Sequence, residues 1–133
     1  DRKNIAIKTD LSPEASWAYA DPRALQHALL NILANAADAL EGREAPAISI
    51  KVMKANGRIH IHIADNGSGM SETQQKDLFK PFYTSKNHGT GLGLVIVKKM
   101  LAKMSGTIEV TSVQDRGTTV DIALPEGRDG TQQ

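Results

Sequence analysis

The chain has 133 residues, of which 40% are hydrophobic and 23% charged, and its formal net charge is +1. This length and composition are typical of one globular domain with its own core. The near-neutral charge and the lack of a dense basic run disfavour nucleic-acid binding. The sequence contains no cysteine, which excludes disulfides, thiolate metal sites and cysteine nucleophiles. No apolar run approaches the length of a membrane span, and we expect no signal peptide.

Two short strands, residues 4–11 and 16–20, are predicted first, and a long helix over residues 20–42 follows. Asp21 is a suitable N-cap for this helix, and Gly42 suits its end. Apolar residues recur at helical spacing and predict one buried face. These residues are Leu25, Ala28, Leu29, Ile32, Leu33, Ala36 and Leu40.

Two alternating segments, residues 47–54 and 58–65, predict a hairpin that turns at Asn56-Gly57. A short helical stretch (71–79) and an irregular segment (80–91) follow. The sequence of residues 92–106 then predicts a second long helix. It closes with a second hairpin, whose strands are residues 107–113 and 118–125 around a turn at 115–117.

The later strands alternate apolar and polar residues, so each strand has one apolar and one polar face. This pattern predicts a largely antiparallel sheet with one face solvated, while helices cover the other face. The predicted fold class is therefore α+β: a two-layer α/β sandwich with a mixed, mostly antiparallel sheet and helices on one face. We expect residues 1–126 to form this domain and the polar residues 127–133 to be a disordered tail.

The first long helix carries a polar stripe. His27, Asn31, Asn35 and Asp38 are spaced by four, four and three residues, so they lie on one side of the helix. A solvated helix face is the simplest interpretation. The alternative is the polar wall of a pocket, because asparagine is a poor helix former and its carbonyl oxygen is a ligand that Mg²⁺ accepts.

Two glycine clusters flank the short helical segment. DNGSGM (65–70) follows a strand and, alone, predicts a turn. GTGLGL (89–94) opens a helix, where free N–H groups and the helix dipole bind phosphate. It is not the dinucleotide pattern G-x-G-x-x-G, because position 94 is leucine, and the chain has no P-loop sequence.

Taken together, these motifs occur in one specific order: Asn-x-x-x-Asn on a helix, Asp-x-Gly-x-Gly, Phe-x-x-Phe, then Gly-x-Gly-x-Gly. In this order the chain resembles the nucleotide-binding domain of bacterial sensor histidine kinases, of the GHKL or Bergerat-type ATPase superfamily. The stretches that match its N, G1, F, G2 and G3 boxes are HALLNILANAADAL, DNGSGM, LFKPFYTSK, GTGLGL and GTT. The resemblance runs from about residue 4 to Pro125, and TSK resembles the nitrogen-regulator and oxygen-sensor branch.

The resemblance implies a catalytic domain that binds ATP and Mg²⁺ and transfers the γ-phosphoryl group to a histidine on a separate dimerisation domain. Asp65 would accept a hydrogen bond from the adenine amino group. A carboxylate only accepts hydrogen bonds, so it favours adenine over guanine. Thr118 would support the base, Asn35 would hold Mg²⁺, and residues 79–90 would form a lid.

The nucleotide-binding residues that the resemblance implies come from the N box, both glycine clusters, the lid and the last hairpin. They are Asn31, Asn35, Asp38, Asp65, Gly67, Gly69, Met70, Tyr83, Thr84, Ser85, Lys86, Gly89, Thr90, Gly91, Leu92, Gly93, Leu94 and Thr118. The implied catalytic residues are Asn31, Asn35 and Lys86.

The chain departs from the family pattern at two positions. Many members carry a lysine where Asp38 stands, so we expect Lys86 in the lid to supply that positive charge, unless it is only a solvated loop residue. The hydrolases of the superfamily carry a glutamate where Asn31 stands. Asparagine cannot act as a base at neutral pH, which favours phosphoryl transfer over ATP hydrolysis.

None of the four histidines lies in a two-helix dimerisation setting, so we expect the phospho-acceptor outside this chain. His60 and His62 alternate outward on a strand and predict a solvated sheet face. His88 falls in the lid and His27 on the helix stripe. No pair has spacing that predicts a zinc site.

The resemblance implies two partners: the histidine-bearing dimerisation domain of the same parent kinase and a downstream response regulator. We expect the isolated domain to be a cytoplasmic monomer without direct membrane contact, although the parent kinase can be membrane-anchored. Three alternatives stay open, namely a GHKL-type ATPase, an anti-sigma serine kinase, and a regulatory domain that binds nucleotide without transfer.

Overall fold

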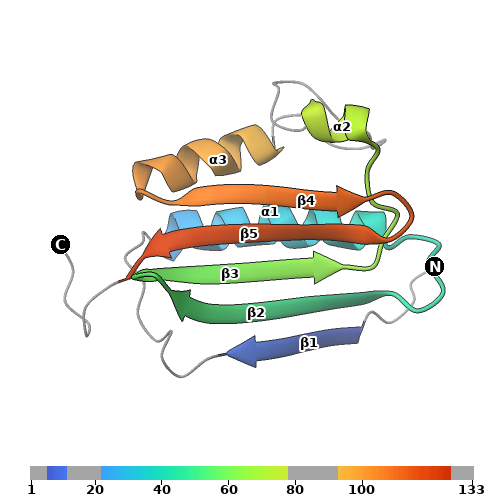
Figure 1. The fold of residues 1–133 in the computed structure, drawn as a ribbon, viewed down its shortest axis with the longest axis horizontal. Helices are drawn as coiled ribbons and strands as arrows, with labels where there is room; N and C mark the ends of the chain where they lie inside the picture. Colours follow the sequence, from blue (N-terminus) through green and yellow to red (C-terminus); the bar gives the residue numbers. More distant parts are fainter. Residues whose placement is uncertain (1–5, 12–21, 78–92, 127–133) are drawn as a thin grey trace.

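The computed structural model describes residues 6–11, 22–77 and 93–126. Within these ranges the strands form one five-stranded sheet in the order β1-β2-β3-β5-β4 (Figure 1). The strands are β1 (Ala6–Leu11), β2 (Ala47–Ala55), β3 (Arg58–Asp65), β4 (Thr107–Val113) and β5 (Gly117–Pro125). β1 pairs with β2 in parallel, and every other neighbouring pair is antiparallel. The parallel pair is possible because helix α1 (Pro22–Ala39) provides the crossover between its two strands.

Two helices, α1 and α3 (Gly93–Lys103), cover one face of the sheet, and α2 (Glu72–Lys76) lies at one end of it (Figure 1). Helix α1 buries a stripe of Ala28, Ile32, Ala36 and Leu40, which is the apolar face that its sequence predicts. Helix α3 contributes Val97, Leu101 and the following Met104 to the same core.

The core lies between these helices and the inward face of the sheet. Alternate residues of β3 and β5 supply most of the sheet side, and they are aligned across the strand pair: Ile61 lies opposite Ile122, and Ile63 opposite Val120. Because side chains alternate along a strand, the intervening residues of both strands lie on the other face. The two-layer α+β fold with a mostly antiparallel sheet is therefore confirmed.

The first hairpin turn is also confirmed. Asn56 and Gly57 have φ values of 56° and 73°, as a two-residue turn with two left-handed residues requires. The helix predicted to end at Gly106 instead ends at Lys103. Ser105 takes a left-handed φ of 60°, and the Gly106 N–H donates to the Leu101 carbonyl at 2.7 Å, which closes the helix end.

Several predictions lie outside the described residues. They include the strand at 16–20, the Asp21 N-cap, the lid at 79–90 and the disordered tail at 127–133. Among the helices that the structure describes, none is long and apolar enough to cross a membrane.

Candidate functional site

A polar row crosses the sheet where β3 ends. Asp65, the last residue of β3, lies directly opposite Thr118 of β5, and Thr118 lies opposite Ser112 of β4. Asp65 is two residues beyond Ile63 and Thr118 is two residues before Val120. Because side chains alternate along a strand, both therefore lie on the inward face of the sheet. The apolar core therefore gives way to hydroxyls and a carboxylate at this end of the space between sheet and helices.

Ser112 links three segments at this row. Its hydroxyl oxygen lies 2.9 Å from that of Thr118, donates to the Gly117 carbonyl at 3.0 Å and accepts the Met70 N–H at 2.8 Å. The sequence did not single out Ser112, because on its strand it is one more polar residue in an alternating pattern. The structure makes it the contact that holds Thr118 and the 65–70 loop together.

The 65–70 loop is held by its own polar residues. The Gly67 N–H donates to the Asp65 carboxylate at 2.8 Å, which fixes the carboxylate against the turn. The Asn66 side chain accepts from the Ala47 N–H at 2.9 Å and donates to the Ala45 carbonyl at 2.8 Å. These bonds tie the loop to the start of β2, so Asp65 has a defined position before any ligand binds.

Two glycines in this loop make close backbone contacts. A Cβ added at Gly67 would lie 2.5 Å from the Ala39 carbonyl oxygen at the end of α1. Gly69 has a left-handed φ of 66°, and an added Cβ would collide with the Val113 carbonyl oxygen. Both glycines are therefore required by contacts within the chain itself, whatever further part they have beside a nucleotide.

The polar stripe of α1 is partly buried. Asn31, Asn35 and Asp38 are half-buried, whereas His27 is exposed. The Ser68 N–H donates to the Ala39 carbonyl at 3.0 Å, so the loop after Asp65 contacts the last turn of α1. Asn35 lies one helical turn before Ala39, about 6 Å along the axis, and this places the end of the stripe beside the loop.

The predicted residues that the structure brings to this end of the fold are Asn35, Asp38, Asp65, Gly67, Gly69, Met70 and Thr118. Asn31 lies one turn further along α1. Helix α3 begins at Gly93, with its N-terminal end toward the side where β3 ends (Figure 1). The Leu94 side chain is partly buried and packs against the core.

The remaining predicted residues lie outside the described part of the chain. They are Tyr83, Thr84, Ser85, Lys86, Gly89, Thr90, Gly91 and Leu92. Their proposed contacts with a nucleotide stay predictions.

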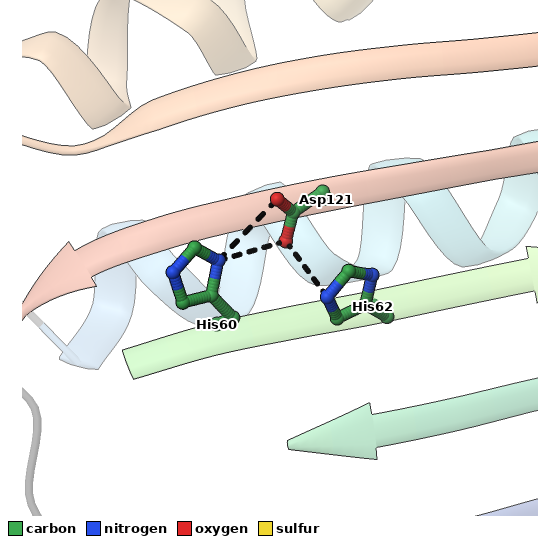
Figure 2. Close-up of side chains that lie close together, drawn as sticks. All are labelled: His60, His62 and Asp121. Atoms are coloured by element: carbon green, nitrogen blue, oxygen red, sulfur yellow. Dashed lines mark hydrogen bonds and ion pairs between the residues drawn. The ribbon is translucent and has the colours of Figure 1, made fainter. Parts of the chain in front are cut away.

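On the opposite face of the sheet, His60, His62 and Asp121 form a second cluster (Figure 2). Both histidines lie on the outward face of β3, as the alternation predicts, but they are not independent, because both rings contact one carboxylate. His60 Nδ1 lies 3.3 Å from each Asp121 oxygen, and His62 Nε2 lies 3.4 Å from Oδ1. The prediction that the histidines form no zinc site considered only pairs of histidines and did not include Asp121. The sequence alone does not show that β5 pairs with β3 and brings Asp121 beside them.

The sequence and the fold of this chain are similar to those of known proteins. A family model described as "Histidine kinase-, DNA gyrase B-, and HSP90-like ATPase" matches residues 20–128. The C4-dicarboxylate transport sensor protein DctB of Rhizobium meliloti (strain 1021) is 40% identical over 119 residues, which are 90% of this chain and 19% of that protein.

Two solved structures share the fold. The mycobacterial sensor histidine kinase MprB is 29% identical with a TM-score of 0.78, and the match covers 92% of this chain and 82% of that one. Full-length ShkA in complex with AMPPNP is 27% identical with a TM-score of 0.80, and the match covers 96% of this chain and 27% of that one. The chain spans about a fifth of the DctB sequence, so its similarity is to one part of a longer sensor protein.

Proposed function

Because this chain belongs to the histidine kinase-, DNA gyrase B- and HSP90-like ATPase family, we propose that it is the catalytic, ATP-binding domain of a two-component sensor histidine kinase. Its reaction is the transfer of the γ-phosphoryl group of ATP to a histidine on a dimerisation domain. Residues 1–126 are the proposed domain. The observation that carries the proposal is the placement of Asp65 opposite Thr118, at the end of the core where β3 ends.

Asp65 is suited to recognise adenine. It is half-buried, a carboxylate only accepts hydrogen bonds, and the Gly67 N–H donates to one of its oxygens. Its carboxylate attracts the amino group of adenine and repels the carbonyl oxygen that guanine carries at the same edge. Thr118, held in place by Ser112, adds a hydroxyl directly opposite, so the polar row fits an adenine base.

The phosphates belong on the side where α1 ends and α3 begins. The first N–H groups of α3 have no partners within the helix and attract anions. Asn35 is the residue that would hold Mg²⁺, because an amide oxygen is a neutral hard ligand that suits a magnesium ion bound to phosphate. Bound there, the ion would neutralise charge on the phosphates. Many family members carry a lysine where this chain has Asp38. We assign the role of that lysine, a positive charge beside the γ-phosphate, to Lys86.

The residues of α1 favour transfer over hydrolysis. Asn31 is half-buried on the stripe and cannot take a proton from water at neutral pH. Its amide can donate a hydrogen bond to a phosphate oxygen and accept one from a ligand, which orients the phosphate without activating water. Catalysis then rests on positioning and on neutralising charge.

The acceptor histidine lies on a partner domain in this proposal. That partner is the dimerisation domain of the same parent kinase, and the phosphoryl group passes from it to a response regulator. The catalytic domain alone is a cytoplasmic monomer, and it reaches its acceptor through the rest of the parent protein.

Isothermal titration calorimetry tests the adenine assignment. We expect the chain with Mg²⁺ to bind ATP more tightly than GTP. The Asp65→Asn variant should weaken ATP binding by tenfold to a hundredfold, since a hydrogen bond to a charged group contributes about 1.5–3 kcal/mol. Asparagine keeps an acceptor for the Gly67 N–H, so the loop should stay folded. Asp115→Asn is the matched control, because Asp115 is exposed on the neighbouring turn. Equal affinities for ATP and GTP would refute the role of Asp65.

A transfer assay tests the reaction. The chain is incubated with γ-labelled ATP, alone and with the dimerisation domain of its parent kinase. We expect an acid-labile, base-stable label on the dimerisation domain only. An acid-labile, base-stable label on His27, His60, His62 or His88 would instead make this chain its own acceptor and overturn the proposal.

A further inference from the structure

We propose that His60, His62 and Asp121 form a binding site for a divalent transition-metal ion, with Zn²⁺ as the expected ligand. The three residues lie on the solvated face of the sheet, whereas Asp65 continues the helix-covered face. The site is therefore separate from the nucleotide site and does not depend on its assignment.

The strand pairing brings the three side chains together. His60 and His62 are two residues apart on β3, so both point to the same face, with Cα atoms about 6.6–6.8 Å apart. Asp121 lies directly opposite His62 on β5 and diagonally beside His60. Its carboxylate extends between the two rings, which lie nearly parallel with centroids 6.1 Å apart and an interplanar angle of 19° (Figure 2).

The two distances from the histidine nitrogens to Asp121 match the spacing of neighbouring ligands in a tetrahedral metal site. Zinc binds imidazole nitrogen and carboxylate oxygen at about 2.0–2.2 Å, so two neighbouring ligand atoms around it are roughly 3.3–3.5 Å apart. In this structure, His60 Nδ1 and His62 Nε2 lie 3.3 and 3.4 Å from Asp121 Oδ1. All three ligand atoms lie within 4.8 Å of one another.

The ligand set indicates the kind of metal. Two imidazoles and one carboxylate suit Zn²⁺, Ni²⁺ or Cu²⁺, whereas Mg²⁺ prefers oxygen ligands throughout. Three protein ligands leave a fourth position for water. The side chains are 22%, 35% and 23% exposed for His60, His62 and Asp121, so an ion can enter from solvent and is still partly shielded from it.

The neighbouring strands present one charge of each sign. Glu109 on β4 lies opposite Asp121, and Lys51 on β2 lies opposite His62, and both are exposed. Their opposite charges largely offset each other. The ligands themselves sit on β3 and β5, which both have neighbours on either side in the sheet. Such strands hold their side chains in fixed relative positions, which favours binding because little ordering is required.

A simpler reading of the same geometry is a hydrogen-bonded cluster that binds no metal. Direct titration separates the two. The untagged chain, free of nucleotide and in excess Mg²⁺, is titrated with ZnCl₂ in a calorimeter. We expect one Zn²⁺ per chain, and a melting temperature that rises with Zn²⁺ because only the folded state pairs these strands.

Two ligand variants and one control test the assignment. His62→Thr retains a residue that favours strands, and Asp121→Asn retains the shape of the side chain. Each should weaken Zn²⁺ binding at least tenfold, since even indirect partners of metal ligands contribute tenfold to a hundredfold. His27→Ala, which removes an exposed histidine on α1, should leave the affinity unchanged.

Nuclear magnetic resonance of the wild-type imidazole nitrogens provides a measurement that needs no variant. Zn²⁺ should shift the ring resonances of His60 and His62 but not that of His27. The absence of saturable Zn²⁺ binding, or binding that neither the His62 nor the Asp121 variant weakens, would overturn the proposal. Displacement of Zn²⁺ by millimolar Mg²⁺ would do the same, because it would indicate an oxygen site.

Discussion

Replacing Gly69 by alanine should destabilise the domain more than any other single methyl addition in the 65–70 loop. Gly69 has a φ of 66°, and an added Cβ would collide with the Val113 backbone carbonyl oxygen, which cannot rotate away. The left-handed conformation adds about 1–2 kcal/mol for an alanine, and overpacking adds about 1–3 kcal/mol. We therefore expect the free energy of unfolding to fall by about 2–5 kcal/mol in Gly69→Ala.

Gly57→Ala separates the two contributions. Gly57 has a similar φ of 73°, but an added Cβ would meet no atom within 4 Å. This variant should lose only the conformational part, about 1–2 kcal/mol. Equilibrium unfolding in urea, followed by circular dichroism, measures both variants against wild type. If the two substitutions reduce stability by equal amounts, the close contact between Gly69 and the β4–β5 turn is not a constraint and the reasoning fails.

Three further predictions follow from single residues. Leu101→Ala should lower the free energy of unfolding, measured in urea, by about 2–5 kcal/mol, because Leu101 is fully buried. Leu30 is 58% exposed, so the control Leu30→Ala should change that free energy by less than about 0.5 kcal/mol. Ser71→Ala should lower it by about 1 kcal/mol, since Ser71 caps α2 in a reciprocal capping box, and Ser71→Asp should restore most of the loss. Lys86→Ala should weaken ATP binding about tenfold in calorimetry and adenosine binding much less. If Lys86→Ala binds ATP and adenosine with the same affinities as wild type, Lys86 does not contact phosphate and is only a solvated loop residue.

Local patterns predicted most of the fold. The alternation in β2, β3, β4 and β5 and the helical spacing in α1 depend only on which residues must face the core, and that requirement repeats every few residues. The Asn56-Gly57 turn was equally readable, because its left-handed conformations strongly favour those two residues. The end of α3 was misplaced by three residues, since Ser105 rather than Gly106 adopts the left-handed conformation there.

The motif order also predicted the family, because each box combines residue types whose chemistry suits a nucleotide. What the motifs did not reveal is how their residues are supported. Ser112 connects Thr118 to the 65–70 loop, and Asn66 ties that loop to the start of β2. Both are common polar residues in ordinary positions, so no local pattern distinguishes them.

By itself, the sequence determined which residues of β3 and β5 face the core and which face solvent. Only the tertiary structure decided which residues of the two strands meet. His60 and Asp121 are 61 residues apart, and a register shift of two residues that placed Asp121 opposite Ala64 would keep every residue on its face but separate Asp121 from His60. That register depends on packing buried residues such as Ile61 against Ile122, and therefore on the whole core at once. Such cooperative packing leaves no mark in either strand alone, which is why two unremarkable histidines become a candidate metal site only in the folded sheet.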